Sequence, residues 1–435
     1  MNILIMSHGH PDLSAGGAER AAYSLFEHLR TTPGINRVVF ASRALPDQVG
    51  HSASMGLFRG RPDEPLVSVP MADWPSLMSC DYDSLRRTVE DLVGWVRPDV
   101  VHVHHFAFWS LDLLEILYSL GLRVVFTLHE YMAICQNDGQ MIKTDGRLCE
   151  AASPMECRFC FPDTSPGMFF LRDRIFKGFL SYCDYFIAPS QFLRDRYLSW
   201  GLDPDAITTI ENPLAPEILR KASAKAALRE QKQGTGFAEE AFAAKARGPG
   251  KIRFGYFGQI NPFKGLSTLL EAVSALPPRI RDRIEVGVHG ANLDKQNAEF
   301  QGHMTELLRK QSDVVTSFGP YDNRYVLDLM VSYDWIVVPS IWWKNSPLVI
   351  QEARLLGKPV LCSRIGGMAE KIVHGRDGLH FEPGNSLDLA RKIETIVSLP
   401  EWIANDDAEA LKRRHATAVM KHIELYRRVL RSEVA

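Results

Sequence analysis

Short apolar runs alternate with stretches in which apolar residues recur at helical spacing. Buried parallel strands typically read as continuous apolar runs, and strands that alternate with helices indicate βαβ units. In the first half of the chain we expect strands at residues 2–6, 37–42, 100–104, 123–128, 185–189 and 207–210.

The same alternation restarts after residue 250. The predicted strands there are residues 252–258, 284–290, 314–319, 335–340, 359–363 and 378–382. The pattern predicts two doubly wound, Rossmann-like α/β domains, each with a ligand crevice at the carboxyl ends of its strands. If the domains face each other, those ends line one interdomain cleft.

The expected boundaries follow from shifts in composition. We expect an amino-terminal domain at 1–213, an insert or linker rich in Ala, Lys, Glu and Gly at 214–250, and a carboxy-terminal domain at 251–410. Residues 411–435 form an amphipathic tail helix, which by pattern alone can belong to either domain.

Composition narrows the function classes. The chain has 435 residues, enough for two domains, and its net charge of −2 argues against nucleic acid as the main partner. We expect no signal peptide and no bilayer-spanning segment. Seven cysteines without a secretory signal favour a reducing cytoplasm.

Three stretches follow predicted strands and carry polar chemistry. Gly16 and Gly17 precede a helix, where bare amides favour an anion or a sugar group, although the same pattern also fits a flexible loop. Lys264 lies just before a helix expected to start near Gly265. A cation there is disfavoured by the helix dipole unless an anion is bound between them, so we favour a phosphate site over a solvated lysine.

The third stretch follows the strand at 335–340. Ser346 is expected to cap the next helix, with Pro347 at its first position. Glu352 shares the apolar face of that helix with Leu348, and a carboxylate on such a face needs donors. Ribose hydroxyls would supply two; a structural ion pair with Arg354 or Arg364 is the equal alternative.

His129 ends a predicted strand, where an imidazole can bind a sugar hydroxyl or neutralise developing charge, or simply be a satisfied core residue. The next loop carries four cysteines, and four thiolates suit structural zinc; two disulfides or free thiols are the alternatives. The expected zinc ligands are Cys135, Cys149, Cys157 and Cys160. Residues 168–183 mix aromatic and basic side chains and fit either a membrane surface or a helix packed on the first sheet.

Together these stretches resemble a known family. "GGAER", "APSQFLRDRY", "ENPL", "GQINPFKG", "SFGPYD" and "NSPLVIQEARLLGKPVLCSRIGGMAE" are similar to the retaining GT-B glycosyltransferases of family 4, which use nucleotide-diphosphate sugars. The cysteine loop resembles one in bacterial members that build surface polysaccharides. The resemblance implies a sugar nucleotide donor, a glycan or lipid-linked acceptor and no catalytic cofactor. It also implies a cytoplasmic enzyme, with peripheral contact to the inner face of the membrane as a possibility, and a tail helix packed on the amino-terminal domain.

The resemblance also implies roles for single residues. Lys264 would bind the diphosphate, Glu352 the ribose, and His129 would lie near the transferred sugar. The remaining donor-binding positions would be Gly16, Gly17, Gly258, Gln259, Lys344, Asn345, Ser346, Pro347 and Leu348.

Two positions depart from the family pattern. Gln259 replaces the usual arginine, and Lys344 replaces the first glutamate of an E-x7-E motif, which normally contacts donor-sugar hydroxyls. Lys344 can mean an acidic donor such as a uronate, an impaired site, or a neutral replacement. The competing function classes are a nucleotide-sugar epimerase and a non-enzymatic sugar-nucleotide-binding protein.

Overall fold

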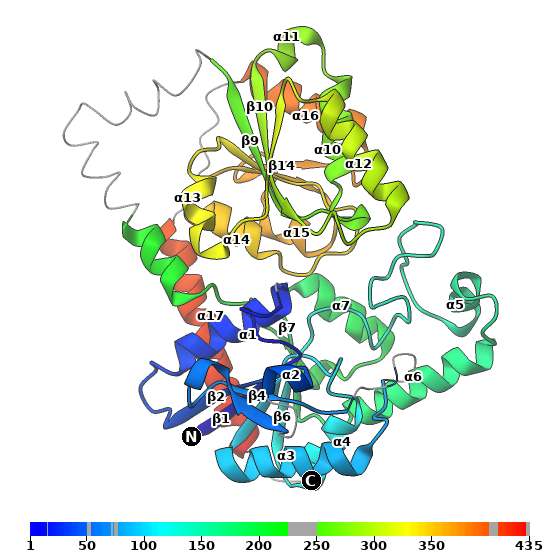
Figure 1. Ribbon diagram of the computed structural model, residues 1–435, viewed down its shortest axis with the longest axis vertical. Coiled ribbons are helices and arrows are strands. Elements are labelled where there is room, and N and C mark those ends of the chain that lie inside the picture. Colours follow the sequence, from blue (N-terminus) through cyan, green and yellow to red (C-terminus); the bar gives the residue numbers. More distant parts are fainter. Residues whose placement is uncertain are drawn as a thin grey trace. The chain divides into compact units, whose positions relative to one another are not determined.

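The computed structural model describes residues 1–14, 16–49, 54–70, 73, 77–224, 250–399 and 408–431. The chain divides into two compact α/β units (Figure 1). The amino-terminal unit comprises Met1–Pro216 and His415–Ala435, and the carboxy-terminal unit comprises Glu217–Arg414. The prediction of two doubly wound units is confirmed.

The amino-terminal unit has an eight-stranded sheet in the order β3-β4-β2-β1-β5-β6-β7-β8. Its strands are β1 (Asn2–Ser7), β2 (Arg37–Arg43), β3 (Met55–Leu57), β4 (Pro65–Val67), β5 (Val100–Val103), β6 (Arg123–Thr127), β7 (Tyr185–Ala188) and β8 (Ile207–Thr209). Neighbouring strands are parallel, except that β3 runs antiparallel to β4. The six predicted strands are present; β3 and β4, with three residues each, were not predicted.

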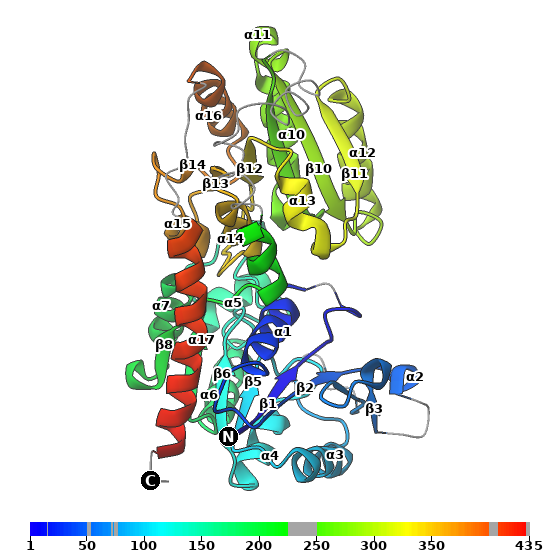
Figure 2. The ribbon, with the colours of Figure 1, turned by 90° about the vertical axis from the view of Figure 1, so that its left-hand side faces the viewer.

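The helices of this unit are α1 (Gly17–Leu29), α2 (Pro46–Val49), α3 (Tyr82–Val96), α4 (Asp112–Ser119), α5 (Pro154–Cys160), α6 (Pro166–Leu180), α7 (Gln191–Trp200) and, from His415 onward, α17 (Ala408–Arg431). In α1, Ala22, Leu25, Phe26 and Leu29 recur at helical spacing and are fully buried. They share one core with β1, β2 and the distal part of α17, including Ile423. The long helix α17 stands out in Figure 2.

The carboxy-terminal unit has six parallel strands in the order β11-β10-β9-β12-β13-β14. These are β9 (Ile252–Gln259), β10 (Ile284–Ala291), β11 (Val315–Gly319), β12 (Trp335–Val338), β13 (Val360–Ser363) and β14 (Gly378–Phe381), all of which were predicted. Its helices are α10 (Leu266–Ala275), α11 (Pro278–Arg281), α12 (Ala298–Lys310), α13 (Val326–Met330), α14 (Leu348–Leu355), α15 (Gly366–Lys371) and α16 (Ser386–Ser398).

Strand order fixes where each unit can bind a ligand. In the carboxy-terminal unit the chain runs outward from β9 to β11 on one side and from β12 to β14 on the other. In the amino-terminal unit the same reversal falls between β1 and β5. Open α/β sheets bind ligands at this switch point, outside the carboxyl ends of the strands.

Two expectations concern segments that the structure covers only in part. Within the predicted insert at 214–250, residues 216–224 are helical, and residues 225–249 lie outside the described residues. In the described part of the chain, no helix combines the length and apolar character needed to span a bilayer.

Candidate functional site

Lys264 lies close to the carboxyl end of β9, at the switch point of its sheet. A short 3-10 turn, Pro262–Lys264, carries it, and the side chain of Asn261 caps this turn by accepting from the amides of Phe263 and Lys264, each at 3.1 Å. Helix α10 begins directly after Gly265, as predicted. Burial lowers the pKa of the Lys264 amine.

The loop after β9 is joined to the loop after β12. Gly265 has φ +69°, and a Cβ there would lie 1.8 Å from the carbonyl oxygen of Pro339, so only glycine fits. The amide of Ile341 donates to the carbonyl of Phe263 at 3.0 Å, and the rings of Phe263 and Trp342 lie 5.9 Å apart. The two loops therefore form one supported surface.

Lys344 extends from the second loop to Lys264, and the two side-chain amines lie close enough to interact. The Lys344 ammonium also lies 4.7 Å from the centre of the Trp342 ring. The amide of Gly367, at the start of α15, donates to the Lys344 carbonyl at 2.6 Å. Burial, together with the neighbouring Lys264, lowers the pKa of Lys344 well below its usual value.

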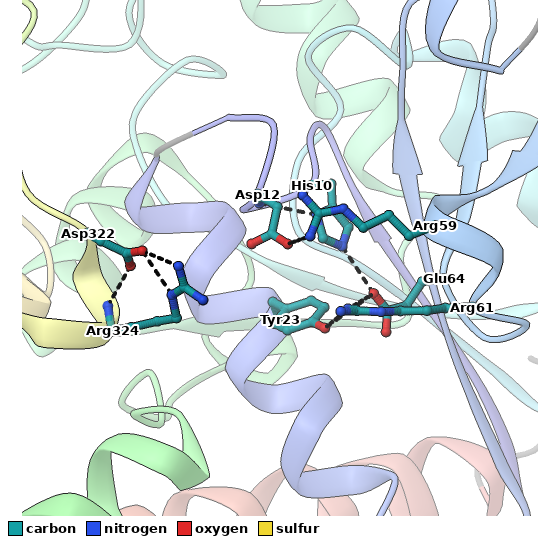
Figure 3. Close-up of polar contacts among 8 residues, drawn as sticks. All are labelled: His10, Asp12, Tyr23, Arg59, Arg61, Glu64, Asp322 and Arg324. Carbon is teal, nitrogen blue, oxygen red and sulfur yellow. Dashed lines mark hydrogen bonds and ion pairs between the residues drawn. The ribbon is translucent and has the colours of Figure 1, made fainter.

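Glu352 lies on α14 and is only 3% exposed. The side-chain amide of Asn323 donates to its Oε1 at 3.5 Å. Asn323 begins the short turn Asn323–Tyr325, which Asp322 caps by accepting from the amide of Arg324 at 2.9 Å; Asp322 and Arg324 also form an ion pair (Figure 3).

The two arginines considered as partners for Glu352 pair with other carboxylates. Arg354 lies 3.6 Å from Asp377, and Arg364 pairs with Glu382.

The predicted helix cap at Ser346 is wrong. Helix α14 begins at Leu348 with Pro347 as its N-cap residue, and no side chain caps it. The Ser346 hydroxyl instead accepts a hydrogen bond from the side-chain amide of Gln351 at 3.1 Å. Asn345 beside it is buried, so residues 345–348 form a compact loop at the same edge of the sheet.

Gly258 and Gln259 are the last two residues of β9. The hydroxyl of Tyr256 donates to the Gln259 carbonyl at 2.7 Å, which fixes the end of the strand. The carboxy-terminal unit therefore brings Lys264, Lys344 and residues 345–348 together on the adjacent loops that follow β9 and β12. Gln259 is the last residue of β9, and Glu352 lies on α14, the helix after the second loop.

In the amino-terminal unit, Gly16 is the N-cap residue of α1 and Gly17 is its first residue, but a carboxylate of this chain lies against Gly16. A Cβ on Gly16 would lie 1.9 Å from Oε2 of Glu19. Glu19 accepts from the hydroxyl of Ser14 at 2.7 Å and pairs with His8 at 3.1 Å. Burial raises the pKa of Glu19, but these contacts outweigh burial and keep it below the usual value.

His129 lies in a group of histidines at the carboxyl ends of β5 and β6. Its Nε2 is 2.9 Å from Nδ1 of His104, and His102 contacts the hydroxyls of Thr127 and Tyr426, each at 2.7 Å. Burial lowers the pKa of His129 to about 3, so its imidazole is neutral at pH 7. It can exchange hydrogen bonds with a sugar hydroxyl but brings no positive charge.

Several polar residues near these positions were not singled out from the sequence. Glu130 directly follows His129 and pairs with His105 at 3.4 Å, and burial raises the pKa of Glu130 to about 8. The position of Glu130 directly after His129 was the sequence feature that could have identified it. His8, Glu19 and Asn323 carry no pattern of their own, and their roles become visible only through their contacts.

A second polar feature of this unit surrounds Glu64. His10 and Tyr23 each contact its Oε2 at 3.2 Å, and Arg61 donates to the same oxygen at 2.9 Å (Figure 3). An adjoining pocket of about 430 Å³ is lined by Tyr23, Glu27, Arg30, Arg61, Pro62, Asp63 and Glu64. Its mixed charges suit a small hydroxylated or charged molecule.

The four loop cysteines are neighbours, and in the described residues they form no disulfide. Burial, together with the other three thiols, raises the pKa of Cys149 to about 11. Among the described residues, however, no three His, Cys, Asp or Glu side chains are arranged around a common point that could hold a metal ion. The four thiols predicted to bind zinc thus lie in one loop, but they are not arranged as ligands around a single metal position.

Comparison with known families covers both units. Residues 15–217 match the model described as "Glycosyltransferase Family 4", and residues 237–415 match "Glycosyl transferases group 1". The chain belongs to the GT-B glycosyltransferases of family 4. The predicted resemblance is confirmed.

Curated relatives of this glycosyltransferase include D-inositol 3-phosphate glycosyltransferase 2 of Catenulispora acidiphila, 26% identical over 49% of this chain and 47% of that protein. The D-inositol 3-phosphate glycosyltransferase of Pseudarthrobacter chlorophenolicus is 30% identical over 37% of this chain and 39% of that protein. The matches thus span less than half the length of these relatives.

Solved structures similar to the glycosyltransferase confirm its fold. Anabaena Alr3699/HepE in complex with UDP aligns with a TM-score of 0.64 and 18% identity, covering 98% of this chain and 99% of that one. Sucrose-phosphate synthase from Thermosynechococcus elongatus aligns with a TM-score of 0.67 and 17% identity, covering 98% of each chain.

Proposed function

We propose that this chain transfers a sugar from a nucleoside-diphosphate sugar to a hydroxyl of an acceptor, with retention at the anomeric carbon. The observation that carries the proposal is the edge of the carboxy-terminal sheet, where two lysine amines meet and a buried carboxylate lies on the helix that follows. A diphosphate needs the cations, and a ribose offers two hydroxyl donors to Glu352. The similar Anabaena protein was solved with UDP and with UDP-glucose, which suits this donor class.

In this proposal the residues have separate roles. Lys264 and the backbone amides of Ser346 and Leu348 stabilise the negative charge that grows on the departing phosphate. His129, being neutral, hydrogen-bonds the transferred sugar. The acceptor oxygen forms its bond to the anomeric carbon on the face that the diphosphate leaves, and the departing phosphate takes the acceptor's proton.

The donor can be tested by thermal unfolding with UDP, GDP and ADP, because a ligand that binds only the folded state raises the melting temperature. We expect one of them to raise it in the wild type and none in Lys264→Ala. Transfer is then measured with sugars of the nucleotide that binds. Binding of none of the three, or hydrolysis and transfer absent with every sugar donor, would contradict the proposal.

A nucleotide-sugar epimerase is the second candidate, because it would use the same donor pocket. It would need no acceptor. Incubating the protein with the donor alone and separating the products by chromatography distinguishes the two: an isomerised sugar nucleotide indicates an epimerase, and the unchanged donor supports a transferase.

For the acceptor we propose a lipid-linked glycan at the inner face of the membrane, in surface polysaccharide assembly. The support is a set of large apolar side chains that are exposed on α5 and α6: Met155, Phe159, Met168, Phe170 and Leu171. Exposed Arg158 and Arg174 lie on the same helices and suit anionic lipid headgroups.

Sedimentation with vesicles of phosphatidylglycerol tests this acceptor class. We expect wild type to sediment and a Phe159→Ser/Phe170→Ser variant to remain in solution, with unchanged melting temperature. Equal sedimentation would favour a water-soluble acceptor, and inositol phosphate is then the first to test because relatives carry that name.

A further inference from the structure

The contact between Lys264 and Lys344 has no compensating charge. The two amines lie close enough to interact, and no carboxylate or other cation in the described residues perturbs either amine. Two like unit charges brought together in a poorly solvated site repel each other strongly. Two charged ammoniums would not stay in contact here unless an anion lay between them.

The support around the pair makes the contact a built feature. The backbone bond from Ile341 to Phe263 and the close approach of Gly265 to Pro339 hold the two loops together. The Lys344 carbonyl is tied to Gly367. These contacts hold the backbones of Lys264 and Lys344 next to each other in the loops that follow β9 and β12.

Trp342 adds an independent sign of a missing acceptor. Its indole N–H is buried, and no acceptor lies within hydrogen-bonding distance in the described structure. The Lys344 ammonium lies beside the same ring, at 4.7 Å from its centre. Buried donors are normally satisfied, and here the side chains that gather are all donors: two amines and one indole.

We propose that Lys264 and Lys344 bind one shared anion, the diphosphate of the donor, so that Lys344 contacts phosphate oxygens and not the sugar. This inference rests on the proposed function, since it takes the donor to be a nucleoside-diphosphate sugar. With this role, the presence of Lys344 implies neither an acidic donor sugar nor an impaired site. Lys344 also supplies a second cation for the diphosphate, which the uncharged Gln259 does not.

The inference has a consequence for protons. Burial lowers the pKa of both amines, and of Lys344 most strongly. A bound diphosphate favours the charged form of each amine. Binding should therefore take up protons from solution at any pH where an amine is neutral in the free protein, and this uptake should fall when Lys344 loses its amine.

Titration calorimetry with UDP and with inorganic pyrophosphate tests the inference, using wild type, Lys344→Met, Lys344→Arg and the control Lys310→Ala. Lys310 is an exposed lysine of the same unit. We expect Lys344→Met to weaken both ligands by roughly ten- to a hundredfold, Lys344→Arg to restore most of the affinity, and Lys310→Ala to change nothing. Repeating the titration in buffers of different ionisation enthalpy measures proton uptake.

Three outcomes would overturn the inference. One is unchanged UDP and pyrophosphate affinity in Lys344→Met. Another is a loss confined to the sugar-bearing donor, above all a UDP-uronate. The third is that wild type binds neither probe. If both probes bind through both lysines but no donor is turned over, the inference stands and the proposed transferase activity fails. Circular dichroism melting confirms that each variant is folded.

Discussion

Glu352 is a carboxylate almost wholly removed from water, and the side-chain amide of Asn323 donates to it at 3.5 Å. A buried carboxylate typically accepts several hydrogen bonds. Lys264 and Lys344 present the opposite case, because both are amines that can carry positive charge. At the scale of single residues, a buried carboxylate and two neighbouring amines favour a ligand that offers both hydroxyl donors and anionic oxygens.

Glu352→Gln should therefore weaken UDP binding by roughly ten- to a hundredfold, since a hydrogen bond to a charged group contributes about 1.5–3 kcal/mol. The shape of the side chain is kept, so the melting temperature should change little. Calorimetry measures the affinity, and 2′-deoxy-UDP is the matched ligand. Wild type should discriminate against the deoxy ligand and the variant should not; equal discrimination by both would contradict the ribose assignment.

At the scale of elements, the close approach of the loops after β9 and β12 depends on Gly265. Gly265→Ala combines a positive φ with a backbone clash, and should cost the carboxy-terminal unit roughly 1–3 kcal/mol. UDP affinity should fall as well, because Lys264 is the preceding residue. The control is Gly302→Ala in α12, where a Cβ meets nothing within 4 Å. Thermal unfolding compares the two, and equal melting temperatures would contradict the prediction.

The cysteine loop offers a second test at this scale. If the loop binds structural zinc, elemental analysis should give about one zinc per chain. Cys157→Ser should lower the zinc content and increase proteolytic cleavage within residues 135–160. A metal-free wild-type protein with the same cleavage pattern as the variant would reject the zinc prediction.

The sequence was sufficient for the central strands because each is a continuous apolar run. It could not reveal β3 and β4, which are too short to show a period. It placed Ser346 as a cap because serine favours that position, whereas the hydroxyl is held by Gln351. The contact between Lys264 and Lys344 depends on β9 and β12 being neighbours in the sheet, which no local pattern shows.

At the scale of the whole molecule, most of the buried histidines among the described residues belong to the amino-terminal unit, whereas His289 belongs to the carboxy-terminal unit. His102, His104, His105, His129 and His422 all belong to the amino-terminal unit, and burial lowers the pKa of each. In the unfolded chain these imidazoles gain protons near pH 6.5. The folded unit does not, so its stability falls as pH drops below that value. Glu130, whose pKa is raised to about 8, has the opposite effect on the pH dependence of stability, but it is one group against five histidines.

Thermal unfolding between pH 8 and 5 should thus show a melting temperature that falls by several degrees below pH 6.5. His102→Gln should make that slope shallower, whatever it does to stability at pH 8. The control His303→Asn, at an exposed position of α12, should leave the slope unchanged. A melting temperature that stays level or rises on acidification would contradict the expected histidine effect.

The helix α17 gives the amino-terminal core residues that include Val419, Ile423, Tyr426 and Val429. During translation, the carboxy-terminal strands emerge from the ribosome before this helix does. A nascent chain can therefore complete the later unit while the earlier one still lacks part of its interior. The amino-terminal unit is synthesised first, but its core can be completed only after the end of the chain has been made.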